Sequence, residues 1–186
     1  MPVFNRAASN PEPQDDHDRP APRTDPAALK APSDVPTRPL HAVTRAQARE
    51  RTGLAVEIEV GEHLVRSDLP VSRGGADSAP APGHLMRAAV AACLVMTYKA
   101  CAAEQGIAVS DVEIDITTEQ SVTGNRTDYG SSFGWRRLRW HVRLTSTATD
   151  QQIASILTRA ERQSPMLATI DSLCERVRTF QVRRPR

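Results

Sequence analysis

Cysteine is scarce in this sequence of 186 residues. The chain has three cysteines, Cys93, Cys101 and Cys174, and no two of them form a CxxC pair. This number and spacing do not suggest a disulfide framework of the kind found in small secreted domains. We therefore expect a cytoplasmic protein in a reducing compartment, where each thiol stays free and can be reactive.

The sequence also lacks a long hydrophobic run. No stretch approaches the ~20 consecutive apolar residues that a membrane-spanning helix needs. The N-terminus has no basic segment followed by an apolar one, so it does not look like a secretory signal. We expect no contact with a membrane.

Metal-ligand clusters and nucleotide-binding motifs are missing as well. No phosphate-binding loop, Ser/His/Asp arrangement or pair of catalytic carboxylates stands out. The histidines show no metal-ligand spacing with one another or with the cysteines. We expect neither a metal nor another cofactor. The histidines are His17, His41, His63, His84 and His141.

Lysine is almost absent, since only Lys30 and Lys99 are lysines among 24 basic residues. The net charge of +2 is too small to indicate nucleic-acid binding on its own. The basic ending, residues 183–186, is most simply a solvated tail.

Proline divides the chain unevenly. Nine of the 14 prolines lie between Pro2 and Pro39, in a stretch with almost no bulky apolar residues. Such a segment cannot bury enough surface to offset its ordering entropy, so we expect residues 1–40 to be disordered. Residues 41–182 are then long enough for one folded domain.

The first half of that domain predicts a strand hairpin followed by a long helix. Apolar residues occupy every second position from Leu54 to Val60, and the pattern resumes at Leu64, so the chain turns near Gly61. Residues 42–51 form either a further strand or a short helix. A helix over residues 84–104 follows, and its middle is apolar nearly all round, so we expect burial on most sides.

The second half predicts two strands and two helices. Apolar residues alternate with acidic ones in residues 112–120 and with arginines in residues 135–145. An antiparallel pairing of these two strands places acidic side chains opposite basic ones. Thr149 is a plausible N-cap for a helix over residues 150–162. Ser164 and Pro165 begin a second helix that extends through Val177, and a short strand over residues 179–182 closes the domain. The pattern is that of an α+β fold with antiparallel sheets packed around a long central helix.

An alternative for the basic strand is a nucleic-acid platform. Such a platform needs exposed aromatic side chains between the arginines, but Trp140 falls on the apolar side of the strand and only Trp135 falls on the basic side. Nucleic-acid binding is therefore a minor alternative. The arginines concerned are Arg137, Arg139 and Arg143.

Three segments carry a resemblance to a known family: DLPVSRGGAD at residues 68–77, APAPGHLM at 79–86 and AAVAAC at 88–93. They resemble the OsmC/Ohr family, in which a Gly-Gly turn and a proline-rich loop lead into a central helix with the first reactive cysteine. The resemblance covers residues 54–182. It implies an intertwined homodimer whose active sites draw on both chains. It also implies reduction of organic hydroperoxides by a thiolate, which becomes a sulfenic acid and is resolved by a second cysteine.

Carried over residue by residue, the resemblance places the first cysteine at Cys93. The second cysteine belongs at the start of the last helix, where this chain has Ser164, and serine cannot form a disulfide. The glutamate that usually follows the loop proline is replaced by Gly83, with His84 next to it. The resemblance implies an arginine from the N-terminal strands, which the sequence does not single out. The candidates are Arg45, Arg49, Arg51 and Arg66.

Neither remaining cysteine is a good substitute for the missing one. Cys101 lies eight residues from Cys93 on one helix, about 12 Å along the axis, too far for a disulfide. Cys174, about ten residues into the predicted last helix, lies about 15 Å from that helix's start.

Two functions stay open for Cys93. As a nucleophile it makes the chain a thiol peroxidase with an external thiol as resolving partner. His84 can then act as a general base or an orienting group in place of the glutamate. The alternative for His84 is a residue that simply caps the helix or faces solvent. As a packing residue it leaves a non-catalytic dimer that binds a small apolar or electrophilic ligand. The pH dependence of thiol alkylation separates the two.

Overall fold

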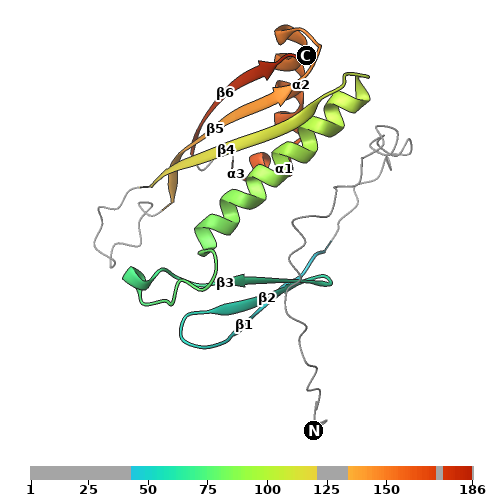
Figure 1. Cartoon of the computed structure of the whole chain (residues 1–186). Coiled ribbons are helices and arrows are strands. Elements are labelled where there is room, and N and C mark those ends of the chain that lie inside the picture. The colour runs from blue at the N-terminus through green and yellow to red at the C-terminus, as the bar shows by residue number, and fades with distance from the viewer. Residues whose placement is uncertain (1–42, 121–133, 171–173, 186) are drawn as a thin grey trace.

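The computed structural model describes residues 43–120, 134–170 and 174–185, so the predicted tail over residues 1–40 lies outside the described residues. The described chain forms two three-stranded sheets, three α-helices and one short 3-10 helix (Figure 1). In chain order these are β1 (Ala46–Glu50), β2 (Val56–Val60), β3 (His63–Ser67), η3 (Val71–Arg73), α1 (Pro82–Glu104), β4 (Ser110–Gln120), β5 (Trp135–Thr145), α2 (Asp150–Gln163), α3 (Pro165–Ile170) and β6 (Glu175–Arg183).

The N-terminal sheet, β1-β2-β3, is antiparallel throughout. This confirms the predicted hairpin at Gly61. Residues 42–51, for which a strand and a short helix were both open, contain the strand β1. Val56, Ile58 and Val65 lie on one face of this sheet, because Ile58 is in register with Val65. The other face holds ion pairs such as Arg49 with Glu59 at 2.6 Å.

The C-terminal sheet, β4-β5-β6, carries the core. Its β4–β5 pair is antiparallel, and Glu113 lies opposite Arg143 with 2.8 Å between their charged groups, which confirms the predicted charge pairing. The inner face packs against α1, α2 and α3 in one cluster of buried side chains. On the outer face Arg137, Arg139 and Arg143 are ion-paired with carboxylates. The buried core includes Val90, Leu94, Tyr98, Leu138, Trp140, Val142, Leu144, Ile153, Ile156, Leu157 and Leu167.

Three predictions for the C-terminal end were wrong. The last helix ends at Ile170, and Val177 lies in β6. The sheet is mixed, because β6 runs parallel to β5 after the α2–α3 crossover returns the chain to the same end of the sheet. Arg183 is the last residue of β6, and Arg184 donates hydrogen bonds to the carbonyls of Ser146 and Ala148, so neither belongs to a solvated tail.

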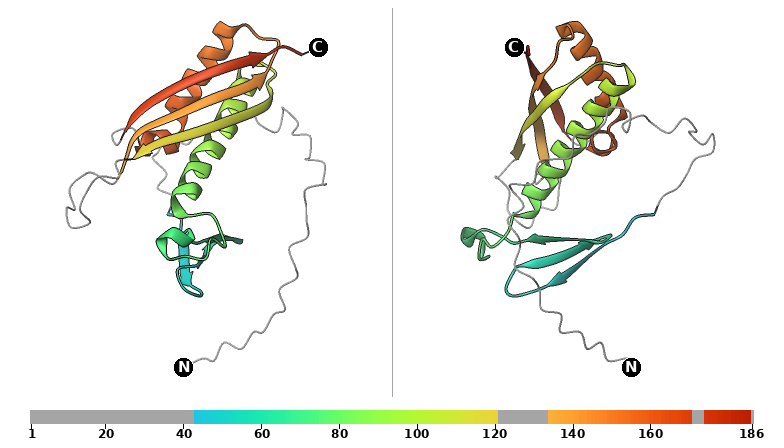
Figure 2. Two further views of the ribbon diagram at one scale, coloured as in Figure 1. Left: turned by 60° about the vertical axis from the view of Figure 1, so that its left-hand side comes forward. Right: turned by 45° about the vertical axis from the view of Figure 1, so that its right-hand side comes forward.

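Helix α1 connects the two sheets and begins beside the N-terminal one (Figures 1 and 2). It was expected to be buried on most sides, but only five of its 23 residues are buried in the single chain. Met86 and Met96 are 41% and 69% exposed. By length and composition alone the helix could cross a membrane, a test that the core helix of a soluble protein also passes. Its buried side chains face α2 and the C-terminal sheet.

The loop between β3 and α1 is held by one buried carboxylate. Asp68 accepts hydrogen bonds from the backbone N–H groups of Leu69, Ala76 and Ser78 at 2.7–3.1 Å, and from the Ser78 hydroxyl at 2.8 Å. These bonds, above all those from Ser78, lower the pKa of Asp68. A Cβ on Gly75 would lie 1.8 Å from the Leu69 carbonyl oxygen, so only glycine fits there.

Candidate thiol site

The candidate site lies where the middle of α1 meets the junction of α2 and α3. The sulfur of Cys93 is 3.4 Å from the hydroxyl oxygen of Ser164. Cys93 is half-buried, whereas Ser164 is fully buried. The structure thus brings together the two side chains that the sequence analysis placed at one site, although 71 residues separate them in the sequence.

Ser164 is held in place by the chain on both sides of it. Its backbone N–H closes α2 on the carbonyl of Glu161, and its side-chain oxygen accepts the N–H of Leu167 at 3.3 Å. Pro165 follows as the first residue of α3, where its missing N–H is no loss. The serine is therefore fixed as an N-cap with its oxygen turned toward α1.

The hydrogen bonds limit which hydroxyl groups can donate to the Cys93 sulfur. The Leu167 N–H donates to the Ser164 oxygen, and in the neutral thiol either Cys93 or Ser164 can donate across their contact. A thiolate has no hydrogen, so in that form the serine hydroxyl is the donor to the sulfur. Thr97 differs, because its hydroxyl donates to the Cys93 carbonyl at 2.7 Å and leaves lone pairs toward the sulfur at 3.9 Å. Among the described residues, Ser164 is thus the hydroxyl that can donate to the sulfur, whereas Thr97 can only accept from it.

A buried polar network that the sequence analysis missed ties α1 to the end of α2. The Tyr98 hydroxyl donates to Glu161 at 2.8 Å and accepts the Trp140 indole N–H at 3.1 Å. Burial, followed by the nearby Glu161 carboxylate, raises the pKa of Tyr98, so the hydroxyl stays protonated. Glu161 is three residues before Ser164, and the network therefore fixes the serine's end of α2 against the helix that carries Cys93. A tyrosine within an alanine-rich helix was the available signal, because a buried hydroxyl needs a partner.

The other predicted site residues lie elsewhere in the single chain. Gly83 and His84 are exposed at the start of α1. His84 is nine residues before Cys93, about 13 Å along the helix axis. All four candidate arginines interact within the N-terminal sheet: Arg45 with Gln47, Arg49 with Glu59, and both Arg51 and Arg66 with Glu57.

The two other cysteines have different surroundings. Cys101 is buried, and its thiol donates to the side-chain oxygen of Gln163 at 3.0 Å. Burial raises the pKa of the Cys101 thiol, which disfavours the reactive thiolate. Cys174 is half-buried against the core just before β6 begins, and not within a helix as predicted. Within the described part of the chain, no three histidine, cysteine or acidic side chains gather in a way that could hold a metal.

These features define a class of protein: an α+β chain with two small sheets, a long central helix and a half-buried cysteine midway along that helix. The family described as "OsmC-like protein" matches residues 75–175, and the chain belongs to that family. Its members include organic hydroperoxide resistance proteins.

Solved structures show the same fold at low sequence identity. An OsmC-like protein from Mycoplasma pneumoniae superimposes with a TM-score of 0.67 and 16% identity, over 77% of this chain and 99% of that one. A Legionella pneumophila organic hydroperoxide resistance protein OsmC gives 0.57 and 21%, over 77% and 99%. An organic hydroperoxide resistance protein from Elizabethkingia anophelis, crystallised with thiocyanate bound, gives 0.62 and 16%, also over 77% and 99%. No curated protein matches the sequence.

Proposed function

We propose that this protein is a cytoplasmic thiol peroxidase that reduces organic hydroperoxides through Cys93 and uses an external thiol to complete the cycle. The observation that carries the proposal is the 3.4 Å contact between the Cys93 sulfur and the Ser164 hydroxyl. A hydroxyl that donates to the sulfur stabilises the thiolate, which is the nucleophilic form. Because Ser164 cannot form a disulfide, the oxidised sulfur needs a partner from outside the chain.

The proposed cycle has three balanced steps. The Cys93 thiolate attacks one peroxide oxygen, the O–O bond breaks, and the departing alkoxide takes up a proton to become an alcohol, which leaves Cys93 as a sulfenic acid. An external thiol then attacks the sulfenic sulfur, forms a mixed disulfide and releases water. A second external thiol attacks the mixed disulfide, which restores the Cys93 thiol and releases an oxidised disulfide.

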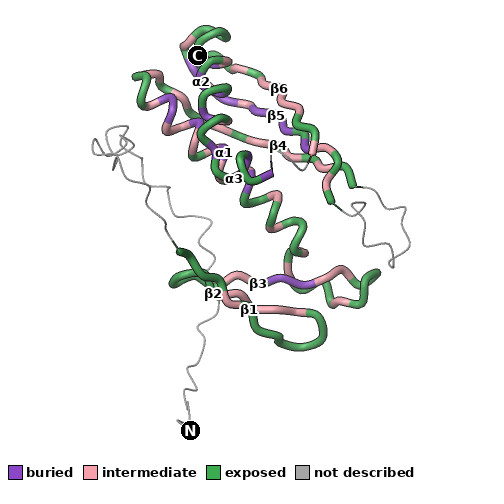
Figure 3. The backbone as a smooth tube through the Cα atoms, turned by 180° about the vertical axis from the view of Figure 1, so that it is seen from behind, coloured by how far each residue is buried: buried purple, intermediate pink, exposed green. Residues whose placement is uncertain are grey.

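The proposal includes an intertwined homodimer. The N-terminal sheet has an apolar face with Val56, Ile58 and Val65, and within the described chain its strands contact mainly one another (Figure 3). The exposed side of α1 carries Met86 and Met96. A second copy that covers both surfaces would remove this apolar area from water. It would also offer a route by which one of the four arginines of the N-terminal sheet reaches the Cys93 site of the partner.

The test follows consumption of cumene hydroperoxide with a monothiol or a dithiol as reductant. We expect turnover by the unaltered chain and no turnover by Cys93→Ser. Cys101→Ser should leave turnover unchanged, because the Cys101 thiol is buried and donates its hydrogen bond to Gln163. Absence of turnover with every reductant tried would contradict the proposal.

Ser164→Cys provides a second, independent readout. At the observed separation of the two side chains, a cysteine at this position lies close enough to Cys93 to form a disulfide after one round of peroxide. We expect a loss of both free thiols in this variant on peroxide treatment and faster turnover with a dithiol. A sulfur pair that stays reduced in the presence of peroxide would count against the assigned site.

A second function is favoured by one observation. The described polar partners of the Cys93 sulfur are neutral hydroxyls, with no charged group among them. This suits a non-catalytic dimer that binds a small apolar or electrophilic ligand next to the cysteine. Protection of Cys93 from alkylation by such a ligand, together with absence of turnover, would support this alternative.

A further inference from the structure

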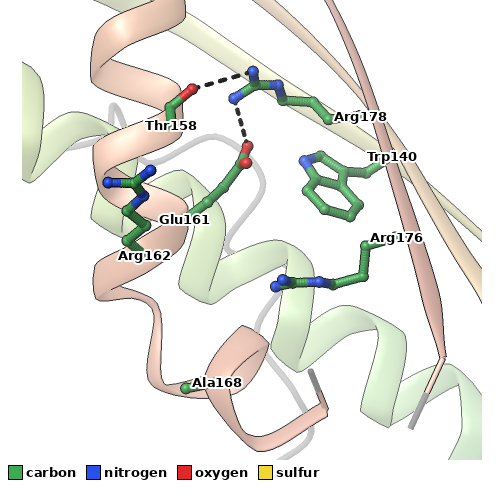
Figure 4. Close-up of a pocket in the computed structure, with 7 residues that line it drawn as sticks. All are labelled: Trp140, Thr158, Glu161, Arg162, Ala168, Arg176 and Arg178. Atoms are coloured by element: carbon green, nitrogen blue, oxygen red, sulfur yellow. Dashed lines mark hydrogen bonds and ion pairs between the residues drawn. The ribbon is translucent and has the colours of Figure 1, made fainter. Parts of the chain in front are cut away.

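A hollow that is separate from the thiol contact lies between α2, α3 and β6 (Figure 4). Its volume is about 790 Å³, which is within the range of small-molecule sites. The lining side chains are Trp140, Thr158, Glu161, Arg162, Ala168, Arg176 and Arg178. Three of these are arginines, and Glu161 is the one carboxylate among the described residues that line the hollow.

Two of the arginines share one face of β6. Arg176 and Arg178 are in register with Leu138 and Trp140, whose side chains point to the inner face of the sheet. Residues two apart on a strand are about 6.8 Å apart along it. In Figure 4 the two guanidinium groups reach into the hollow on either side of the Trp140 ring. This spacing lets both groups approach one bound oxyanion.

Arg178 is fixed before any ligand arrives. Its guanidinium donates to Glu161 at 2.9 Å and to Thr158 at 3.4 Å, and it lies over the Phe180 ring at 5.8 Å. The side chain is still 20% exposed. A guanidinium has five N–H donors, so these two contacts leave others for a ligand. A cation held in place loses little side-chain entropy when an anion binds.

Trp140 lies at the inner end of the hollow, where 4% of the residue is exposed. Its indole N–H is already bonded to Tyr98, which fixes the orientation of the ring. Ala168 on α3 has a small side chain and leaves room opposite. The hollow therefore combines an excess of positive charge, three arginines against one carboxylate, with an apolar inner end.

We propose that this hollow binds a small anion, a carboxylate or phosphate joined to a planar apolar group. The oxyanion lies between Arg176 and Arg178, with Arg162 at the rim, and the planar group lies against Trp140. Binding here does not require Cys93, so it is independent of peroxidase activity.

The test is calorimetric titration of the full chain with benzoate, inorganic phosphate and benzyl alcohol at low ionic strength. We expect saturable binding of at least one anion, weakening with added salt, and none of the neutral alcohol. Tighter binding of benzoate than of phosphate shows that the planar group is recognised in addition to the charge. No saturable binding of either anion would overturn the proposal.

Variants locate the site. Arg176→Gln is expected to weaken binding about tenfold or more, because a charge-assisted hydrogen bond is lost. Arg183→Gln is the matched control, since Arg183 lies on the same strand but on the opposite face, and it should leave affinity unchanged. Ala168→Phe fills the hollow without changing its charge and should block benzoate. Equal affinities of the unaltered chain, Arg176→Gln and Ala168→Phe would place the anion elsewhere.

Discussion

The two ends of α1 lie in contrasting surroundings. Its C-terminal half packs with α2, α3 and the C-terminal sheet, where 15 hydrophobic residues are buried. Its N-terminal half leads to a sheet in which Ser67 is the one buried residue of the three strands. Both sheets follow the same alternation of apolar and polar residues. The difference teaches that an alternating sequence predicts that one face of a sheet is covered. It does not say whether the same chain or a second copy covers that face.

The largest expected effect is on stability, which should fall more when a side chain is truncated in the C-terminal core than in the N-terminal sheet. Leu157 is fully buried in α2, and Leu157→Ala should lower the free energy of unfolding by about 2–5 kcal/mol, because it leaves a cavity. Leu64 on β3 is 50% exposed, and Leu64→Ala should cost less than about 1 kcal/mol in dilute solution. Chemical denaturation at two protein concentrations checks both. Equal losses for the two variants at every concentration would contradict the comparison.

The next effect concerns the loop that joins the two regions. Gly75→Ala places a methyl group 1.8 Å from the Leu69 carbonyl oxygen. We expect it to destabilise the protein by about 1–3 kcal/mol, since the backbone around Asp68 must move. Thermal unfolding measures the loss. Gly134→Ala is the control, because nothing lies within 4 Å of a Cβ there, and a similar loss in both variants would show that the close approach at Gly75 is unimportant.

A charge on the exposed side of α1 tests whether a second copy covers it. Met96→Glu should be tolerated by a single chain, because Met96 is 69% exposed. If the proposed dimer buries this position, the charge should weaken self-association at least tenfold, because an unpaired carboxylate is costly to bury. Sedimentation equilibrium measures the constant. Gln151→Glu is the control, because it adds the same charge on the exposed side of α2, away from α1. Equal association constants for the two variants would show that α1 is not part of the interface.

The sequence predicted the local elements better than their long-range partners. Thr149 was identified as an N-cap, and the structure has it in a capping box with Gln152. The helical spacing from Leu167 to Val177 was misleading, because pairing of β6 with β5 outweighs the local pattern at Val177. For the site, the family resemblance placed Cys93 and Ser164. The Tyr98–Glu161–Trp140 network could not be predicted in the same way, because it joins three elements that periodicity treats separately.

The smallest expected effect is a pH dependence confined to the loop between the two regions. Asp68 has a pKa below its ordinary value of 3.8, chiefly because Ser78 donates to its carboxylate. Its stabilising contribution is therefore fully present above that ordinary value and is lost as the pH falls through the lower pKa of the folded state. Asp68→Asn should flatten the fall of unfolding free energy in acid. Asp77→Asn, an exposed acid of the same loop, should keep the full slope. If the unaltered chain and Asp68→Asn lose stability in parallel below about pH 4, the carboxylate does not hold the loop, and the close approach of the chain at Gly75 is its remaining constraint.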